Sequence, residues 1–109
     1  MARDAGLEEL VREYLGDDPG LTGTAMFGGW CWLLDGRLLC GANQEGVLVR
    51  LGKGNDAWAL ALDSAEPLKT GQRVMAGWVR VPAEAFADDT VGRRLIHEAL
   101  AFVRGLPPK

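Results

Sequence analysis

The chain has 109 residues, of which 48% are hydrophobic and 25% are charged, and its formal net charge is −3. This length fits one domain with one core, and the acidic balance argues against broad electrostatic binding to nucleic acid or anionic membranes. One His, one Ser and two Cys offer few groups for catalysis, so most hydrolase and metal-enzyme classes are disfavoured, and we predict no catalytic residue, metal or cofactor.

The first predicted element is an amphipathic helix over residues 5–15. Asp4 is placed to cap its N-terminus and Gly16 to end it. The first 18 residues contain six acids and two bases, so the negative charge of the chain is concentrated here, most simply on a solvated face. The apolar residues of this helix recur at helical spacing: Leu7, Leu10, Val11, Tyr14 and Leu15.

Short strands separated by tight turns follow the helix. Asp35-Gly36 is a strong signal for a two-residue hairpin turn. A short helix and a loop then lead to a further strand, a helical turn and a last amphipathic helix that starts near Asp89 or Thr90 and ends near Arg104. The predicted strands cover residues 21–27, 30–34, 37–42, 47–51 and 73–81; the short helix covers 55–62, the loop 63–72 and the helical turn 82–86.

This order predicts an α+β fold in a single domain over residues 1–109. We expect an antiparallel sheet of about five strands with helices at both ends of the chain, in the order α-β-β-β-(β)-α-β-α. The start of the chain has no apolar signal region, and no stretch is long and apolar enough for a membrane span, which predicts a cytoplasmic protein.

Four segments carry a resemblance to a known family: Met26-Phe27-Gly28-Gly29 before Asp35-Gly36, the run 47–52 with Arg50, the run 75–82 and the ending 101–109. Their order and spacing resemble the TfoX/Sxy N-terminal domain, in its single-domain form. The resemblance implies an α-β-β-β-α-β-β-α fold and assigns no catalytic residue. Two-domain members of the family regulate natural competence through a chain with a second, helical domain; since this chain ends at Lys109, we do not carry that role over.

The hairpin turns also predict which side chains share a face of the sheet. A two-residue turn at Asp35-Gly36 sets Leu34 opposite Arg37 and, further along, Cys31 opposite Cys40; the next hairpin sets Cys40 opposite Val49. One face is then apolar and lies against the helices: Cys31, Leu33, Leu38, Cys40, Val47, Val49 and Leu51. The other face gathers the candidate partner-binding or ligand-binding residues: Trp30, Trp32, Arg37, Arg50, Trp78 and Arg80.

Three interpretations of this Trp and Arg face remain open. The Trp side chains are core beneath loops with Arg stems at the rim, or they form a protein interface, or they form a stacking platform for single-stranded nucleic acid or a nucleotide. With the family resemblance, the second interpretation predicts a small non-catalytic interaction or regulatory module that acts through protein contacts, including a homodimer through this face or a sheet edge. Nucleic-acid or nucleotide binding is the alternative, and an enzyme of unknown type is a third.

The few reactive side chains have structural interpretations. Cys31 and Cys40, if opposed, lie within disulfide range, but a buried Cys on an apolar face is usually a small hydrophobe, and we expect both to be reduced in the cell. His97 has no partner at metal-ligand spacing and is expected on a solvated helix face. Ser64 lies in a loop without the sequence of a nucleophile elbow.

Overall fold

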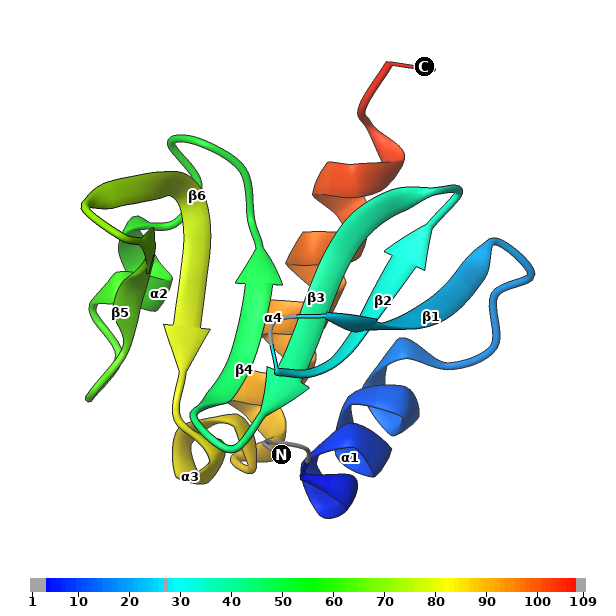
Figure 1. Ribbon diagram of the computed structural model, residues 1–109, viewed down its shortest axis with the longest axis horizontal. Coiled ribbons are helices and arrows are strands. Elements are labelled where there is room, and N and C mark those ends of the chain that lie inside the picture. The colour runs from blue at the N-terminus through cyan, green and yellow to red at the C-terminus, as the bar shows by residue number, and fades with distance from the viewer. Residues whose placement is uncertain (1–3, 27, 108–109) are drawn as a thin grey trace.

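The computed structural model describes residues 4–26 and 28–107 (Figure 1). It confirms the predicted α+β class with helices at both ends of the chain. Six strands form one antiparallel sheet in the order β1-β2-β3-β4-β6-β5. The elements are α1 (Ala5–Leu15), β1 (Leu21–Met26), β2 (Gly29–Leu34), β3 (Arg37–Asn43), β4 (Gly46–Arg50), α2 (Ala57–Leu60), β5 (Glu66–Thr70), β6 (Arg73–Val81), α3 (Ala83–Phe86) and α4 (Asp89–Arg104).

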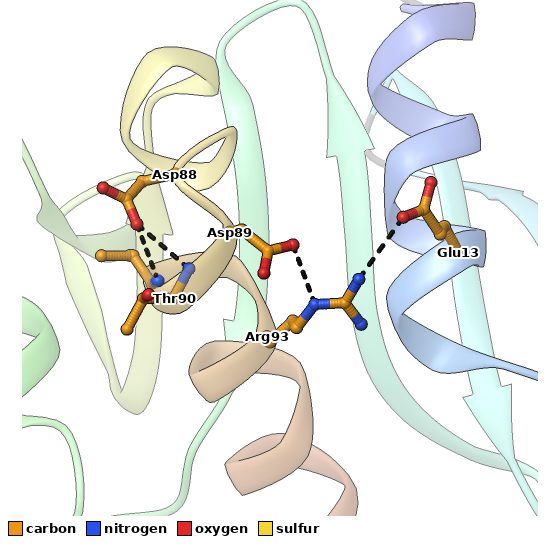
Figure 2. Close-up of polar contacts among 6 residues, drawn as sticks. Glu13, Asp88, Asp89, Thr90 and Arg93 are labelled. Carbon is orange, nitrogen blue, oxygen red and sulfur yellow. Dashed lines mark hydrogen bonds and ion pairs between the residues drawn. The ribbon is translucent and has the colours of Figure 1, made fainter.

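The two long helices pack beside each other against one face of the sheet. In α1 the Asp4 carboxylate accepts a hydrogen bond from the Leu7 N–H at 3.0 Å, which confirms the predicted cap. Arg93 of α4 joins the helices, because its guanidinium pairs with Asp89 at 2.8 Å and with Glu13 of α1 at 3.5 Å (Figure 2). These contacts hold α1 against α4, and both helices pack on β3.

Two predicted segments differ from the structure. The predicted loop 63–72 contains the edge strand β5, which escaped detection because its Pro, its charges and its single buried residue, Leu68, break the pattern of a strand. The short helix is only one turn long, Ala57–Leu60, within the predicted range 55–62. Phe27, the predicted end of the first strand, lies outside the described residues.

A β-bulge changes the register between β2 and β3. Leu34 lies opposite Arg37 and Leu33 opposite Leu38, as predicted, but β3 then contains one extra residue. Trp32 therefore lies opposite Cys40, and Cys31 opposite Gly41, so the predicted pairing of the two cysteines is wrong. Since side chains alternate with a period of two, this single residue reverses the two faces of β2 relative to β3.

The bulge separates the predicted Trp and Arg face into two groups. Trp30 and Trp32 share the helix side of the sheet with the core residues Cys40 and Ala42, and Cys31 points the other way. The pairs between β4 and β6 set Arg50 opposite Trp78 and Leu48 opposite Arg80, so alternation puts Trp78 and Arg80 on the face away from the helices. Arg50 is the last residue of β4, and its guanidinium reaches Phe102 of α4. The prediction of one shared surface for all six residues is wrong.

Candidate functional site

An open groove of about 600 Å³ lies between the C-terminal end of α1 and the β1–β2 hairpin. Its size is within the roughly 300–1,000 Å³ that ligand pockets commonly have. Two of the six predicted site residues, Trp30 and Trp32, belong to it. The lining residues are Arg12, Leu15, Gly16, Asp17, Asp18, Pro19, Leu21, Thr22, Gly23, Trp30 and Trp32.

The absence of a side chain at Gly23 allows the Trp30 indole to lie across β1. A Cβ atom on Gly23 would come within 2.4 Å of Trp30 Nε1, although the residue opposite Gly23 in the ladder is Trp32. Trp32 is 6% exposed and forms part of the core, whereas Trp30 is only half-buried. The groove therefore presents one accessible indole, which extends toward the edge of the sheet.

The rim of the groove carries two acids and one base. Asp18 accepts a hydrogen bond from the Gly20 N–H at 2.8 Å and pairs with Arg104 of α4 at 2.7 Å; together these contacts lower the pKa of Asp18. Asp17 is exposed, and Arg12 lies 3.7 Å from the Glu8 carboxylate. The rim thus presents charges of both signs beside an apolar surface.

Arg37 and Arg50 lie away from this groove. Arg37 donates hydrogen bonds to the carbonyls of Leu106 and Pro107 beyond the end of α4. The Arg50 guanidinium lies 5.9 Å from the ring centre of Trp78 and 5.7 Å from that of Phe102, and it donates to the Leu38 carbonyl at 3.2 Å. Both guanidinium groups thus have contacts within the domain: Arg37 has backbone hydrogen bonds, and Arg50 has cation–π contacts and a backbone hydrogen bond.

Arg80 lines a small pocket of about 260 Å³ together with Ser64, Glu66 and other residues. Its guanidinium lies 3.4 Å from the Glu45 carboxylate, while its buried Nε has no hydrogen-bond partner within the described residues. The residues that line this pocket include no His, and His97 is exposed on α4. Ser64 and His97 therefore do not form the arrangement that a serine nucleophile requires.

A third cluster, which the sequence reasoning missed, joins α2 to α4. Trp58 Nε1 donates to Glu98 at 3.1 Å, and the Arg94 guanidinium stacks 3.8 Å above the Trp58 ring while it pairs with Glu98 at 2.8 Å. The spacing of Arg94 and Glu98 signals an ion pair on one helix, but nothing in the spacing shows that Trp58 covers it. Trp58 and Glu98 line a second groove of about 650 Å³.

The two cysteines are free and buried, as expected for small hydrophobes. Cys31 Sγ contacts the Met26 carbonyl at 3.8 Å. Burial raises the pKa of the Cys31 thiol to about 11 and raises that of Cys40 further, so neither is a ready nucleophile at neutral pH. Among residues 4–26 and 28–107, no three His, Cys, Asp or Glu side chains gather as metal ligands.

Residues 13–103 match the TfoX N-terminal domain, which is most of the chain. The chain belongs to the TfoX N-terminal domain family. The resemblance seen in the sequence is thereby confirmed, and this TfoX N-terminal domain has one strand more before α2 than the resemblance implies. The matched region includes β1, β2 and, except for Arg12, the residues that line their groove. Comparisons with curated proteins and with solved structures gave no match.

No helix within the described part of this TfoX N-terminal domain is long and apolar enough to cross a membrane.

Proposed function

We propose that this domain is a protein-interaction module that binds an apolar side chain of a partner against Trp30. The observation that carries the proposal is the half-buried Trp30 indole, which lies across Gly23 in an open groove with a buried Trp32 beside it. Trp is enriched among the residues that contribute most to protein interfaces, because it offers a large and rigid apolar surface. The groove offers apolar contact and charge pairing, which suit a regulatory binding role.

The nucleic-acid alternative required one aromatic and basic sheet face. The bulge divides that face, and the Arg50 guanidinium already has cation–π contacts with Trp78 and Phe102 and donates to the Leu38 carbonyl. Trp30, in contrast, lies in a groove whose rim carries Asp17 and Asp18 beside Arg12, and Asp18 is paired with Arg104, so the rim offers no excess of positive charge to phosphate groups. These features favour a protein partner.

The proposed function is tested with random peptides displayed on phage and selected on the wild-type domain. We expect clones that bind the wild type and lose at least about tenfold in affinity, roughly 1.4 kcal/mol, when Trp30→Ala removes the indole. Trp58→Ala is the matched control, because Trp58 is also half-buried but lines the other groove. If selected clones tolerate Trp30→Ala as well as Trp58→Ala, the groove is not the binding site.

A further inference from the structure

The two edges of the sheet differ in their protection against strand addition. The β5 edge contains Pro67 between Glu66 and Lys69, together with a register shift, and these features hinder pairing with another strand. The β1 edge, Leu21–Met26, has no Pro and no charge, and its register with β2 is regular. Among residues 4–26 and 28–107, no further strand lies beside β1, so its outer side is open to a partner strand.

The hydrogen-bond pattern shows which backbone groups face this open edge. The Gly20 carbonyl accepts from the Asp35 N–H at 2.9 Å, immediately before the first pair of the β1–β2 ladder. Bonded and non-bonded pairs alternate in an antiparallel ladder. The N–H and C=O groups of Leu21, Gly23 and Ala25 therefore point away from β2, toward the open side.

The sequence of this edge is nearly symmetric about its central glycine. It reads Leu21-Thr22-Gly23-Thr24-Ala25, with a Thr on each side of Gly23 and an apolar residue beyond each Thr. When two copies pair antiparallel with Gly23 opposite Gly23, every outward-facing position finds an outward-facing partner, and a shift by two residues loses part of this pairing. Thr22 then lies opposite Thr24 of the second copy, and the large Leu21 opposite the small Ala25. Cross-strand Thr pairs are favourable, so β1 is complementary to itself.

The same register brings the two Trp30 side chains together. The Trp30 indole fills the space that a side chain on Gly23 would take, on the helix side of the sheet. In a bonded antiparallel pair the Cα atoms lie about 5.5 Å apart, so indoles that cover two opposed Gly23 residues come within the distance of an aromatic pair. The apolar group that lies against each Trp30 is then the indole of the other copy.

The charges near this edge do not oppose such pairing. Strand β1 itself carries none. Asp18 lies five residues before Gly23, so at about 3.3 Å per residue a two-fold axis there separates the two Asp18 side chains by about 33 Å, several times the screening length of about 8 Å. Helix α1 packs on β3 and α4, set back from the edge. A second copy can therefore approach β1 without like charges meeting at its centre.

We propose that two copies of this chain pair through β1 about a two-fold axis at Gly23, which joins their sheets into one and places the two Trp30 indoles in contact. This proposal rests on the proposed function and names the partner as a second copy. The interface consists of one short strand and one indole from each copy, which is smaller than a standard protein interface, so the dimer forms and dissociates with concentration.

Sedimentation equilibrium of the full chain over about 5–500 μM tests the proposal. We expect a monomer–dimer equilibrium within this range, and dimerisation at least about tenfold weaker for Trp30→Ala. Trp58→Ala, which removes a half-buried indole from the other groove, is the matched control and should leave the equilibrium unchanged.

Two double variants test the register, because Thr22 lies opposite Thr24 of the second copy only when the axis passes through Gly23. Both side chains are on the face away from the helices, so neither change enters the core. Thr22→Lys with Thr24→Lys places like charges opposite each other, and we expect about tenfold weaker dimerisation. Thr22→Lys with Thr24→Glu places opposite charges there, and we expect about tenfold tighter dimerisation.

Ala25→Pro tests the backbone pairing itself. It removes an N–H that points to the open edge and takes none from the β1–β2 ladder, and Pro is tolerated on edge strands. We expect loss of the dimer with an unchanged melting temperature at low protein concentration, where the wild type is also a monomer.

The outcomes separate this proposal from the proposed function. A chain that stays monomeric up to about 500 μM, together with phage clones that need Trp30, overturns the dimer and leaves the groove as a binding site. A dimer that is indifferent to Ala25→Pro, or that responds equally to the two double variants, forms elsewhere and also overturns the proposal. A dimer that passes both of these tests but tolerates Trp30→Ala retains the strand pairing and overturns the role of Trp30, and with it the proposed function.

Discussion

Cys31 and Cys40 show how the environment of a single residue sets its chemistry. They lie in neighbouring strands, yet the bulge turns them to opposite faces of the sheet, and each is buried. Burial disfavours the charged thiolate, which is the form that reacts. The thiols therefore serve as small apolar side chains in this fold, and geometry keeps them from pairing with each other.

Native alkylation tests this assignment of the cysteines. At pH 8, iodoacetamide is expected to label Cys31 about a hundredfold more slowly in the folded chain than in urea, because its pKa rises from 9.0 to about 11. Cys40 is expected to be slower still. Mass spectrometry of timed samples measures both rates, and labelling of either thiol at the unfolded rate would contradict its burial.

At the scale of elements, two backbone irregularities, a bulge in β3 and a positive φ at Gly77 in β6, determine how neighbouring strands of the sheet are placed. The extra residue in β3 sends Trp30 and Trp32 to the helix side, where they form the groove. In β6, Gly77 has a φ of +87°, and its carbonyl accepts from the N–H groups of both Leu51 and Gly52. This second irregularity joins the end of β4 to β6.

Gly77→Ala tests the backbone approach in β6. A Cβ atom there would lie 2.6 Å from the carbonyl carbon of Gly52, at a φ that L residues rarely adopt, so we expect destabilisation by about 2–4 kcal/mol. Gly71→Ala is the control, since its φ is +63° but no atom lies within 4 Å; we expect a cost of about 1 kcal/mol. Urea unfolding measures both, and equal effects would exclude the steric explanation.

At the scale of the whole molecule, Asp18 and Arg104 join the turn after the first helix to the end of the last helix. Asp18 lies in the turn after α1, and Arg104 ends α4; their 2.7 Å ion pair connects residues 86 positions apart beside the groove. The hydrogen bond from Gly20 and the contact with Arg104 lower the pKa of Asp18 below the ordinary value of 3.8. Folding thus favours the ionised carboxylate.

Asp18→Asn is expected to lower the melting temperature at neutral pH. Because the pKa is lowered in the folded state, the stabilisation is present above the unfolded pKa and is lost as the pH falls below 3.8 through the folded value. The difference in melting temperature between wild type and variant should therefore shrink in that acidic range. Asp17→Asn is the control, and a difference that does not depend on pH would exclude the linkage.

The sequence predicted the elements well where local signals were strong. The periodicity of α1 and α4, the cap at Asp4, and the turn at Asp35-Gly36 depend on residues close together in the chain. The predicted range of β6 is also confirmed. β5 was missed because an edge strand with one buried side chain has little apolar alternation to detect.

The site was only partly predictable. The sequence singled out Trp30 and Trp32 among its candidates. The predicted strand pairing did not include the bulge after Leu33, so it placed these two Trp side chains on the wrong face of the sheet. Whether the groove residues bind a partner remains a prediction that the peptide experiments test. Trp58 gave no usable signal, because its partners Arg94 and Glu98 come from a distant helix.

The sequence by itself determined the α+β class, the acidic first helix and the numbers of Trp and Arg residues, since these follow from composition and local periodicity, and its motifs carried the resemblance to the family. Only the tertiary structure decided which side chains share a face, which sheet edge is unprotected and where the groove lies. The physical reason is that a sheet alternates with a period of two, so one inserted residue reverses a face without any change in local pattern.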